Sequence, residues 1–305
     1  MNRNTSILII NVSYIGDVVS SLGATQLLIE KFGNVDFLTQ VYFTSILYDE
    51  PNISPVTMEE AIHKKYDIIF DFTSSKESRK LLKKLSANII YGQHKSLRHR
   101  LLYSRYYTKT YPRRDQHIVY DFMATIHKYT DKSCPKPQLH AQPSADIPKF
   151  QVGLHFGSRN PIRQIPTTLI DTIIKHLRYL DISLVILGDE EENIKQLCLA
   201  HGDYPVYRKT SLFELKNTIA NLQLFIGPDS GLLHIAAALN IPSIGIYGPN
   251  LPSIAGPIGE KVYFVETVHD CRPCNQNIPC PYDIKCLSQI NFKDQIEPII
   301  KTIIT

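Results

Sequence analysis

The segment with the clearest capacity for chemistry is Asp229-Ser230-Gly231-Leu232-Leu233-His234, which follows an apolar, strand-like stretch and a Gly-Pro turn. Asp229 or Ser230 can cap a helix that continues through the next alanines to Leu239. The first turn of a helix has free backbone N–H groups and the positive end of the helix dipole, which suit an anion such as a diphosphate. An ordinary strand-to-helix turn often contains the same Gly and Ser, so this spacing alone leaves both interpretations open.

A second loop favours the ligand-binding interpretation. Residues 241–249 form another apolar, strand-like stretch that ends in a Gly-Pro turn at Gly248-Pro249. Two such turns are expected side by side at the carboxyl edge of one parallel sheet, where open α/β folds bind ligands. His234 falls near the inner side of the first helical turns, where it would either donate to a phosphate or pack in the core.

Asp17 follows the first apolar strand of the chain, Ile7–Val12, on the loop Ser13-Tyr14-Ile15-Gly16-Asp17. A carboxylate on such a loop can act as a general base if it is ionised and within hydrogen-bond reach of the nucleophile. Asp is also a common helix N-cap, and position alone favours the cap.

Two further loops carry concentrated charge. Arg159 and Arg163 lie near a Gly-Ser turn, where they would either pair with a diphosphate leaving group or belong to a solvated loop. Four acidic residues at 189–192 follow the apolar stretch 183–187. A carboxylate there could hydrogen-bond a ribose hydroxyl, or the acidic residues could simply stabilise the start of a helix.

Four of the six cysteines fall within sixteen residues, at Cys271, Cys274, Cys280 and Cys286. Such close spacing suits a tetrahedral zinc site or an iron centre, although only the first two have the C-x2-C spacing of a standard zinc half-site. The alternative is a set of reduced structural thiols, as expected in a reducing compartment. Both interpretations make the segment structural.

A basic stretch extends from His94 to Arg114, with seven Lys or Arg residues, four interleaved tyrosines and no Asp or Glu. Cations attract an anionic acceptor or lipid headgroup, and tyrosines add amphipathic contact. A solvated basic surface is the alternative. A nucleic-acid site ranks last, because no nucleic-acid-binding motif accompanies the stretch.

The elements that must position these residues form two series of alternating strands and helices. Strands are expected at 7–12, 36–39, 66–72 and 87–91, and again at 151–155, 183–187, 222–226 and 243–247. Four prolines between Lys132 and Lys149 mark a linker. We therefore predict α/β domains over residues 1–143 and 150–290, followed by a C-terminal helix over 291–305.

Composition agrees with this organisation. The 305 residues suit two domains of about 150 residues each. A hydrophobic fraction of 43% is ordinary for a globular protein, and a formal net charge of +4 does not call for nucleic acid. We see no signal peptide and no apolar run of about 20 residues, and so expect a cytoplasmic protein.

Taken in order, these motifs resemble glycosyltransferase family 9, the ADP-heptose:lipopolysaccharide heptosyltransferases. Residues 229–234 match the family's D-[ST]-G-x-x-H element, and Tyr247-Gly248-Pro249 matches its [YF]-G-P. Residues 7–18 resemble its opening strand and S-x-x-G-D loop, and residues 152–158 resemble the first strand and loop of its second domain. This sequence departs from the family at three adjacent positions. Arg163 stands where the family usually has Lys, and Gln164 and Ile165 replace a basic residue and a Trp.

The resemblance implies an α/β fold of GT-B architecture, in which two Rossmann-like domains face each other across a cleft. The first domain would bind the acceptor and the second the nucleotide sugar, and the C-terminal helix often crosses back to the first. The implied activity is inverting transfer of heptose from ADP-heptose to a lipopolysaccharide inner-core sugar, with no metal required for transfer.

The family match also assigns residues to roles. Asp17 would be the catalytic base. An anionic glycolipid acceptor at the inner membrane face would contact Ser13, Lys95, Arg98 and Arg100. The donor would be held by Arg163, Glu191, Asp229, Ser230, Gly231, Leu232 and His234. A structural zinc or iron would be held by Cys271, Cys274, Cys280 and Cys286.

Two alternatives stay open. One is the same fold with another nucleotide sugar or a protein acceptor. The other is a non-catalytic sugar-nucleotide-binding protein, against which the retention of both Asp17 and the 229–234 element argues. We also expect the donor site to survive removal of any metal from the cysteine segment with only a modest loss of binding, because transfer in this fold requires no metal.

Overall fold

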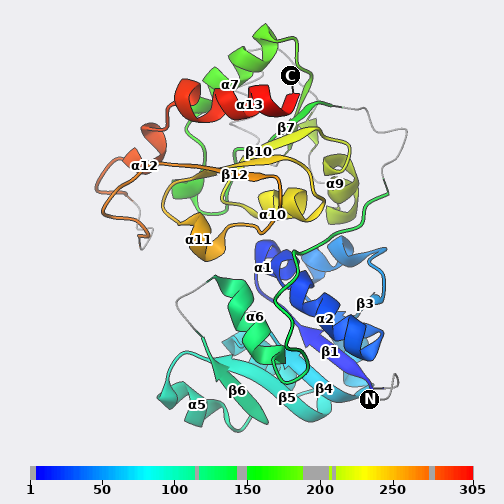
Figure 1. The fold of residues 1–305 in the computed structure, drawn as a ribbon. Helices are drawn as coiled ribbons and strands as arrows, with labels where there is room; N and C mark the ends of the chain where they lie inside the picture. The colour runs from blue at the N-terminus through cyan, green and yellow to red at the C-terminus, as the bar shows by residue number, and fades with distance from the viewer. Residues whose placement is uncertain are drawn as a thin grey trace. The chain divides into compact units, whose positions relative to one another are not determined.

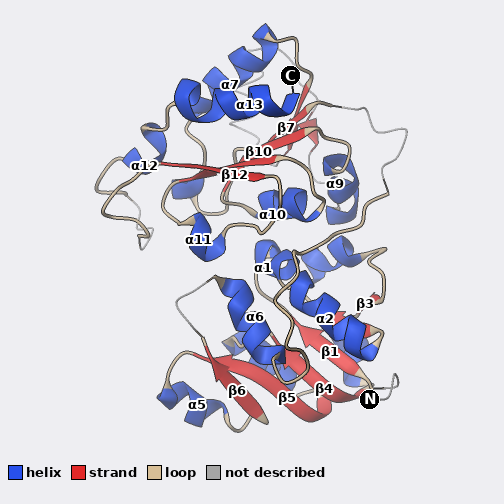
Figure 2. Cartoon of the chain, in the orientation of Figure 1, coloured by secondary structure: helices blue, strands red, loops and turns tan. Residues whose placement is uncertain are grey.

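The computed structural model describes residues 5–113, 117–142, 150–187, 206–207, 211–274 and 279–304. The chain divides into two compact units, Met1–His140 and Ala141–Thr305. Each unit is built on a six-stranded sheet whose strands all pair in parallel. Figures 1 and 2 show the two sheets with the helices around them. The expected fold class, with two parallel-sheet α/β domains, is confirmed.

The first sheet has the strand order β3-β2-β1-β4-β5-β6. Its strands are β1 Ile7–Ile10, β2 Val35–Leu38, β3 Ile53–Pro55, β4 Lys65–Asp71, β5 Ser86–His94 and β6 Lys109–Pro112. The connecting helices are α1 Ile15–Ser20, α2 Leu22–Phe32, the 3-10 helix η1 Val41–Leu47, α3 Met58–Ile62, α4 Lys76–Leu82, α5 Leu97–Tyr103 and α6 Ile118–Ile126.

The sequence pattern from 18 to 32 suggests one helix, but the structure has two. The break falls at Ser21, whose hydroxyl donates to the carbonyl of Val18 at 2.7 Å. A serine side chain that bonds to the backbone of the preceding turn competes with regular helix continuation. The helix α1 therefore ends at Ser20, and Asp17 lies in a helix of only six residues.

The second sheet has the order β12-β11-β10-β7-β8-β9. Its strands are β7 Val152–Leu154, β8 Leu184–Leu187, β9 Val206–Tyr207, β10 Leu224–Pro228, β11 Ser243–Tyr247 and β12 Val262–Glu266. Its helices are η2 Pro161–Arg163, α7 Thr167–Tyr179, α9 Leu212–Ile219, α10 Gly231–Ala238, α11 Pro252–Ala255, α12 Lys285–Ser288, η3 Phe292–Ile296 and α13 Glu297–Ile304. Figure 1 shows α7 and α13 on one face of this sheet, and α9 and α10 on the other.

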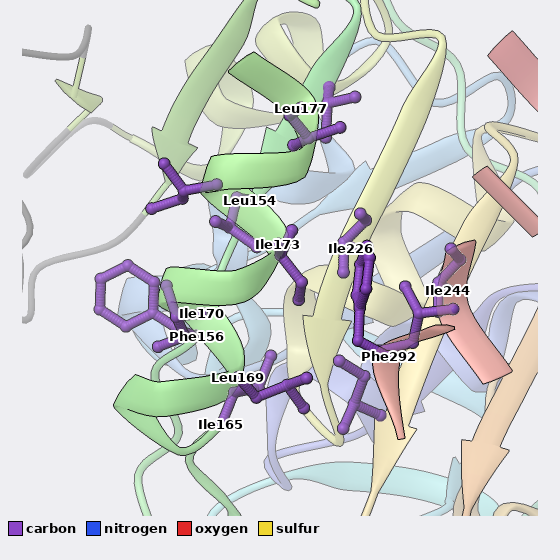
Figure 3. Packing of buried hydrophobic residues seen from close by; sticks show 14 of the residues in the cluster. Leu154, Phe156, Ile165, Leu169, Ile170, Ile173, Leu177, Ile226, Ile244 and Phe292 are labelled. Atoms are coloured by element: carbon purple, nitrogen blue, oxygen red, sulfur yellow. The ribbon is translucent and has the colours of Figure 1, made fainter. Parts of the chain in front are cut away.

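The core of the second unit lies between the sheet and α7. Leu169, Ile173 and Leu177 recur every four residues, so they form one apolar stripe on that helix. This stripe packs on strand residues that include Ile226 and Ile244, as Figure 3 shows. The C-terminal segment joins the same cluster through Phe292, Ile296 and Ile300, and α13 contacts β10.

Both sheets have the doubly wound order, and this order determines where a ligand can bind. Counted within each unit, the strands run 3-2-1-4-5-6, so the winding reverses between β1 and β4 and between β7 and β10. Ligands of open α/β sheets bind outside the carboxyl ends of the strands at this switch point. The loops that follow β1, β4, β7 and β10 are therefore the first places to look for a site. Among the described residues, no helix has both the length and the apolarity needed to cross a membrane.

Candidate functional site

Asp17 lies on the loop that leaves β1, at the switch point of the first sheet. It is partly buried in the first turn of α1, and it accepts a hydrogen bond from the hydroxyl of Ser13. The N-cap of α1 is Tyr14, without a side-chain capping bond. The interpretation of Asp17 as a helix cap is therefore wrong, and its carboxylate is oriented by Ser13 instead.

Buried and neighbouring amides hold the backbone of this loop. Asn11 is fully buried, and its side chain donates to the carbonyl of Asp17 at 3.1 Å. Gln40, which follows β2, donates to the carbonyls of Val12 and Ser13 at 2.8 and 2.9 Å. The turn is therefore fixed from two strands, and its position does not depend on the sequence of the turn alone.

A cavity of about 310 Å³ lies at the same sheet edge. Thr73 joins it to the Asp17 loop, because this residue lines the cavity and its hydroxyl accepts the Val12 N–H at 2.8 Å. Among the described residues that line the cavity none is acidic, and four are cationic: Lys76, Arg79, Lys95 and Arg113. The cavity is therefore suited to an anion.

Asp71, the last residue of β4, anchors the loop beneath this cavity. It is fully buried and accepts hydrogen bonds from the hydroxyls of Tyr107 and Ser78, both at 2.7 Å, and from the N–H groups of Thr73 and Ser74. Burial raises the pKa of Asp71, and these hydrogen bonds oppose the rise. Sequence analysis missed Asp71, although a lone carboxylate at the end of a buried apolar strand was a usable signal.

The structure separates the residues expected to bind the acceptor. Ser13 lies at Asp17 and Lys95 lines the cationic cavity. Arg98 and Arg100 lie instead on the exposed surface of α5 and do not line the cavity. No residue of α5 is buried, and Leu97 and Leu101 are 74% and 76% exposed.

The second candidate site lies at the switch point of the other sheet. Asp229, directly after β10, is 7% exposed and pairs with Arg163 at 3.1 Å between Oδ2 and Nη1. Asn250, on the loop after β11, donates to the same oxygen at 2.6 Å. Burial raises the pKa of the Asp229 carboxyl, and the charge of Arg163 opposes this. The structure thus joins two of the predicted donor residues to each other.

Ser230 is the N-cap of α10, but its side chain makes no capping hydrogen bond. Its hydroxyl oxygen is buried and has no partner among the described residues. Gly231 and Leu232 open the helix and are partly exposed, whereas His234 is only 8% exposed and lies within the unit. Glu191 lies outside the described residues. A buried hydroxyl without a partner beside free helix N–H groups is suited to accept an anionic ligand.

The described cysteines do not fit a metal site as they lie. Cys271, Cys274, Cys280 and Cys286 are free thiols, and burial raises the pKa of Cys286. Within the described part of the chain, no group of three or more His, Cys, Asp or Glu side chains is arranged to hold a metal ion. The metal interpretation of the cysteine spacing therefore gains no support from this arrangement.

Comparison with known proteins identifies one enzyme family. The model of glycosyltransferase family 9 (heptosyltransferase) matches residues 57–283. Lipopolysaccharide heptosyltransferase 1 of Salmonella typhimurium is 27% identical over 210 residues, which are 65% of this chain and 66% of that protein. For two other curated heptosyltransferases the matched stretch spans only 17% and 24% of their length.

Two solved structures share the fold over most of this chain. A family 9 glycosyl transferase from Veillonella parvula has a TM-score of 0.81 at 18% identity, covering 98% of this chain and 97% of its own. The Escherichia coli heptosyltransferase WaaC, solved with ADP, has a TM-score of 0.73 at 21% identity, covering 85% and 92%. At these identities the likeness establishes the fold.

The anchoring of Asp71 can be tested with a pair of tyrosine variants. Tyr107→Phe removes one donor to the buried carboxyl, so it should lower the free energy of unfolding by about 1–3 kcal/mol, the usual cost of leaving a buried group unsatisfied. The hydroxyl of Tyr106 has no hydrogen-bond partner among the described residues. Tyr106→Phe should therefore change the free energy of unfolding by less than about 0.5 kcal/mol. Urea unfolding followed by circular dichroism measures both, and equal effects would contradict the anchoring role.

Proposed function

We propose a function on the premise that this chain belongs to glycosyltransferase family 9, the heptosyltransferase family, whose model matches most of its length. The chain transfers a heptose from ADP-heptose to an anionic inner-core sugar of lipopolysaccharide, with inversion at the anomeric carbon. The observation that carries this proposal is the buried Ser230 hydroxyl without a partner at the start of α10, next to the Arg163–Asp229 pair.

Asp17 is the base of the proposed reaction. Its carboxylate removes the proton from an acceptor hydroxyl, whose oxygen attacks the anomeric carbon as the bond from that carbon to the diphosphate breaks. Attack from the side opposite the leaving group inverts the configuration. The hydrogen bond from Ser13 orients the carboxylate, and the amides of Asn11 and Gln40 hold the loop that carries it.

The donor diphosphate binds at the start of α10. The helix N–H groups and the Ser230 hydroxyl donate to phosphate oxygens, and Arg163 adds a positive charge. Arg163 pairs with Asp229, and its side chain remains 30% exposed. Such groups act most strongly on the charge that develops as ADP departs. The E. coli structure solved with ADP supports an adenine nucleotide.

The acceptor binds at the first unit. The cationic cavity with Lys76, Arg79, Lys95 and Arg113 takes an anionic group of the acceptor, and Thr73 places it beside the Asp17 loop. The exposed leucines of α5, with Arg98 and Arg100, contact an anionic membrane surface in which the lipid part of the acceptor lies. No step of this reaction is assigned to the cysteine segment.

The role of Asp17 is tested by Asp17→Asn. Loss of a general base should lower kcat by a factor of about 10²–10⁴ while leaving ADP affinity unchanged, because ADP binds in the other unit. Glu30→Gln, which removes a carboxylate from the exposed end of α2, should leave kcat unchanged. Transfer assays with ADP-heptose measure kcat, and a near-wild-type value for Asp17→Asn would remove this residue from the mechanism.

The donor site is tested by calorimetry with ADP. Arg163→Ala should weaken binding by about 1.5–3 kcal/mol, as expected for a lost hydrogen bond to a charged group. Lys175→Ala, which removes an exposed cation from α7, serves as the control and should bind as the wild type does. Equal affinities for Arg163→Ala and wild type would place the diphosphate elsewhere. Tighter binding of UDP than of ADP would favour another nucleotide sugar.

The membrane surface is tested by replacing Leu97 and Leu101 with serine. Each buried leucine contributes about 1.5–3 kcal/mol, so the double variant should bind phosphatidylglycerol-containing vesicles at least about tenfold more weakly. Tyr179→Ser, which changes an exposed aromatic residue of the second unit, should bind as the wild type does. Sedimentation with the vesicles measures the difference, and unchanged binding by the double variant would rule out α5 as the contact.

A further inference from the structure

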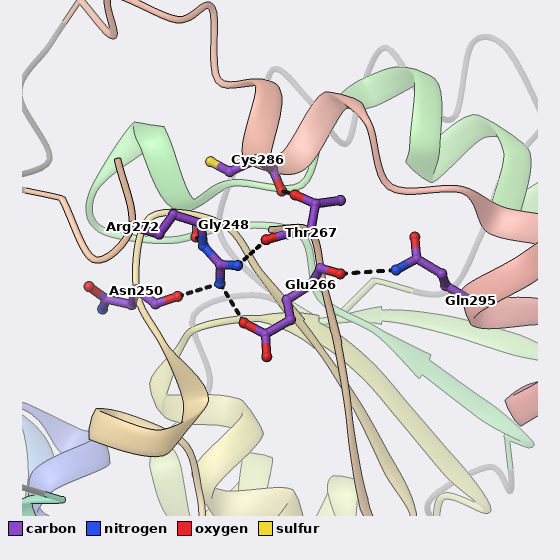
Figure 4. Close-up of polar contacts among 7 residues, drawn as sticks. All are labelled: Gly248, Asn250, Glu266, Thr267, Arg272, Cys286 and Gln295. Carbon is purple, nitrogen blue, oxygen red and sulfur yellow. Dashed lines mark hydrogen bonds and ion pairs between the residues drawn. The ribbon is translucent and has the colours of Figure 1, made fainter. Parts of the chain in front are cut away.

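Arg272 is a buried cation inside the cysteine segment, directly after Cys271. Its side chain is only 4% exposed, although arginine is rarely buried without a specific arrangement of partners. Figure 4 shows its guanidinium pointing into a ring of acceptors. It donates to the backbone carbonyls of Gly248, Thr267 and Asn250, the last at 2.8 Å, and to the Glu266 carboxylate at 2.7 Å.

Three of these four acceptors are backbone carbonyls, which determines what Arg272 can do. A carboxylate would suffice to neutralise the charge, so Glu266 alone accounts for the ion pair. The carbonyls instead give the guanidinium fixed geometry, because its planar fork of N–H groups bonds several acceptors at set angles. Arg272 therefore holds two stretches of chain, the β12 end and the loop after β11, in one relative position.

The loop after β11 is held by the cysteine segment at other points as well. The N–H of Cys274 donates to the carbonyl of Pro249 at 3.2 Å. A Cβ added at Gly248 would lie 2.5 Å from the Leu287 side chain of α12, so the loop passes that helix at a distance that only glycine allows. Contacts with Arg272, Cys274 and Leu287 thus fix the loop from Gly248 to Asn250.

Asn250 connects this loop to the candidate donor site. Its side chain donates to Asp229 at 2.6 Å, and Asp229 in turn pairs with Arg163 at 3.1 Å. Asn250 therefore links Arg272 to Asp229. Its backbone carbonyl accepts a hydrogen bond from Arg272, and its side chain donates one to Asp229. The candidate donor site is thus connected to the cysteine segment through Asn250, and its expected independence from any metal in that segment stays a prediction.

We propose that Arg272 is a positioning residue for the donor diphosphate. It holds the 248–250 loop in the conformation that places Asn250 on Asp229, so that Arg163 is in position before the nucleotide arrives. A loop that is ordered in advance spares the ordering cost on binding. The expected effect of Arg272 on nucleotide affinity rests on the proposed function. Its effect on the conformation of the 248–250 loop does not depend on that function.

A double-mutant cycle tests the route through Asn250. Arg272→Lys keeps the positive charge but loses the planar guanidinium that bonds several acceptors at once. If the fraction of molecules with the 248–250 loop in its binding conformation falls to about one tenth, ADP should bind this variant about tenfold more weakly. In the Asn250→Ala background the same substitution should change the dissociation constant less than about twofold, because coupled residues are non-additive. Additive effects would overturn the proposal.

Two controls separate positioning from general stability. Glu266→Gln retains the three carbonyl contacts, so its ADP affinity should match that of the wild type, as measured by calorimetry well below the melting temperature of each variant. If Arg272→Lys lowers the melting temperature but leaves ADP affinity unchanged, the residue is structural and the positioning role is wrong.

A measurement without nucleotide tests the holding of the loop. The Cys274 amide donates to Pro249, so its hydrogen exchange should be faster in Arg272→Lys than in wild type, and unchanged in Glu266→Gln. Equal exchange in wild type and Arg272→Lys would show that Arg272 does not hold the loop. If the wild type binds no ADP, the donor proposal fails, and this exchange measurement still decides the role of Arg272.

Discussion

The reversal of winding at the switch point of each sheet is the constraint on which the candidate sites depend. At β1/β4 and at β7/β10 the connections leave toward opposite faces, so the loops after these strands lie next to each other with no helix between them. In the first unit this brings the Asp17 loop to Thr73, and in the second it brings Arg163 to Asp229. Polar groups far apart in sequence meet there because the parallel strands end at one edge.

Each sheet also has a buried carboxyl at the end of its central strand. Asp71 closes β4 and Asp229 follows β10, and burial raises the pKa of both. Their partners differ in kind. Asp71 accepts bonds from hydroxyls and backbone N–H groups, which fix a turn, whereas Asp229 accepts bonds from Arg163 and Asn250, which belong to other loops. The first carboxyl therefore shapes one loop, and the second holds several loops together.

The position of the cysteine segment depends on the same arrangement of loops. The sequence draws attention to its thiols, yet Arg272, which lies between Cys271 and Cys274, donates to four residues of the neighbouring segments. The segment packs against the loop after β11 and so reaches the surroundings of Asp229 through Asn250. A stretch that looks like an independent structural element is thus connected by hydrogen bonds to the second candidate site.

The sequence by itself determined the two α/β units, most of their strands, the loops at 13–17 and 229–234, and the resemblance to family 9. These features are local: buried strands appear as apolar runs, and turns appear as Gly, Pro, Ser and Asp at fixed spacing. The structure decided whatever depends on contacts between distant segments. Examples are the bond from Tyr107 to Asp71, across 36 positions, and the bonds from Arg272 to Gly248 and Asn250, across 24 and 22. The periodicity of a sequence indicates which residues are buried. It does not indicate which buried polar groups are hydrogen-bonded to each other, because the strand order of the folded protein determines which groups are neighbours.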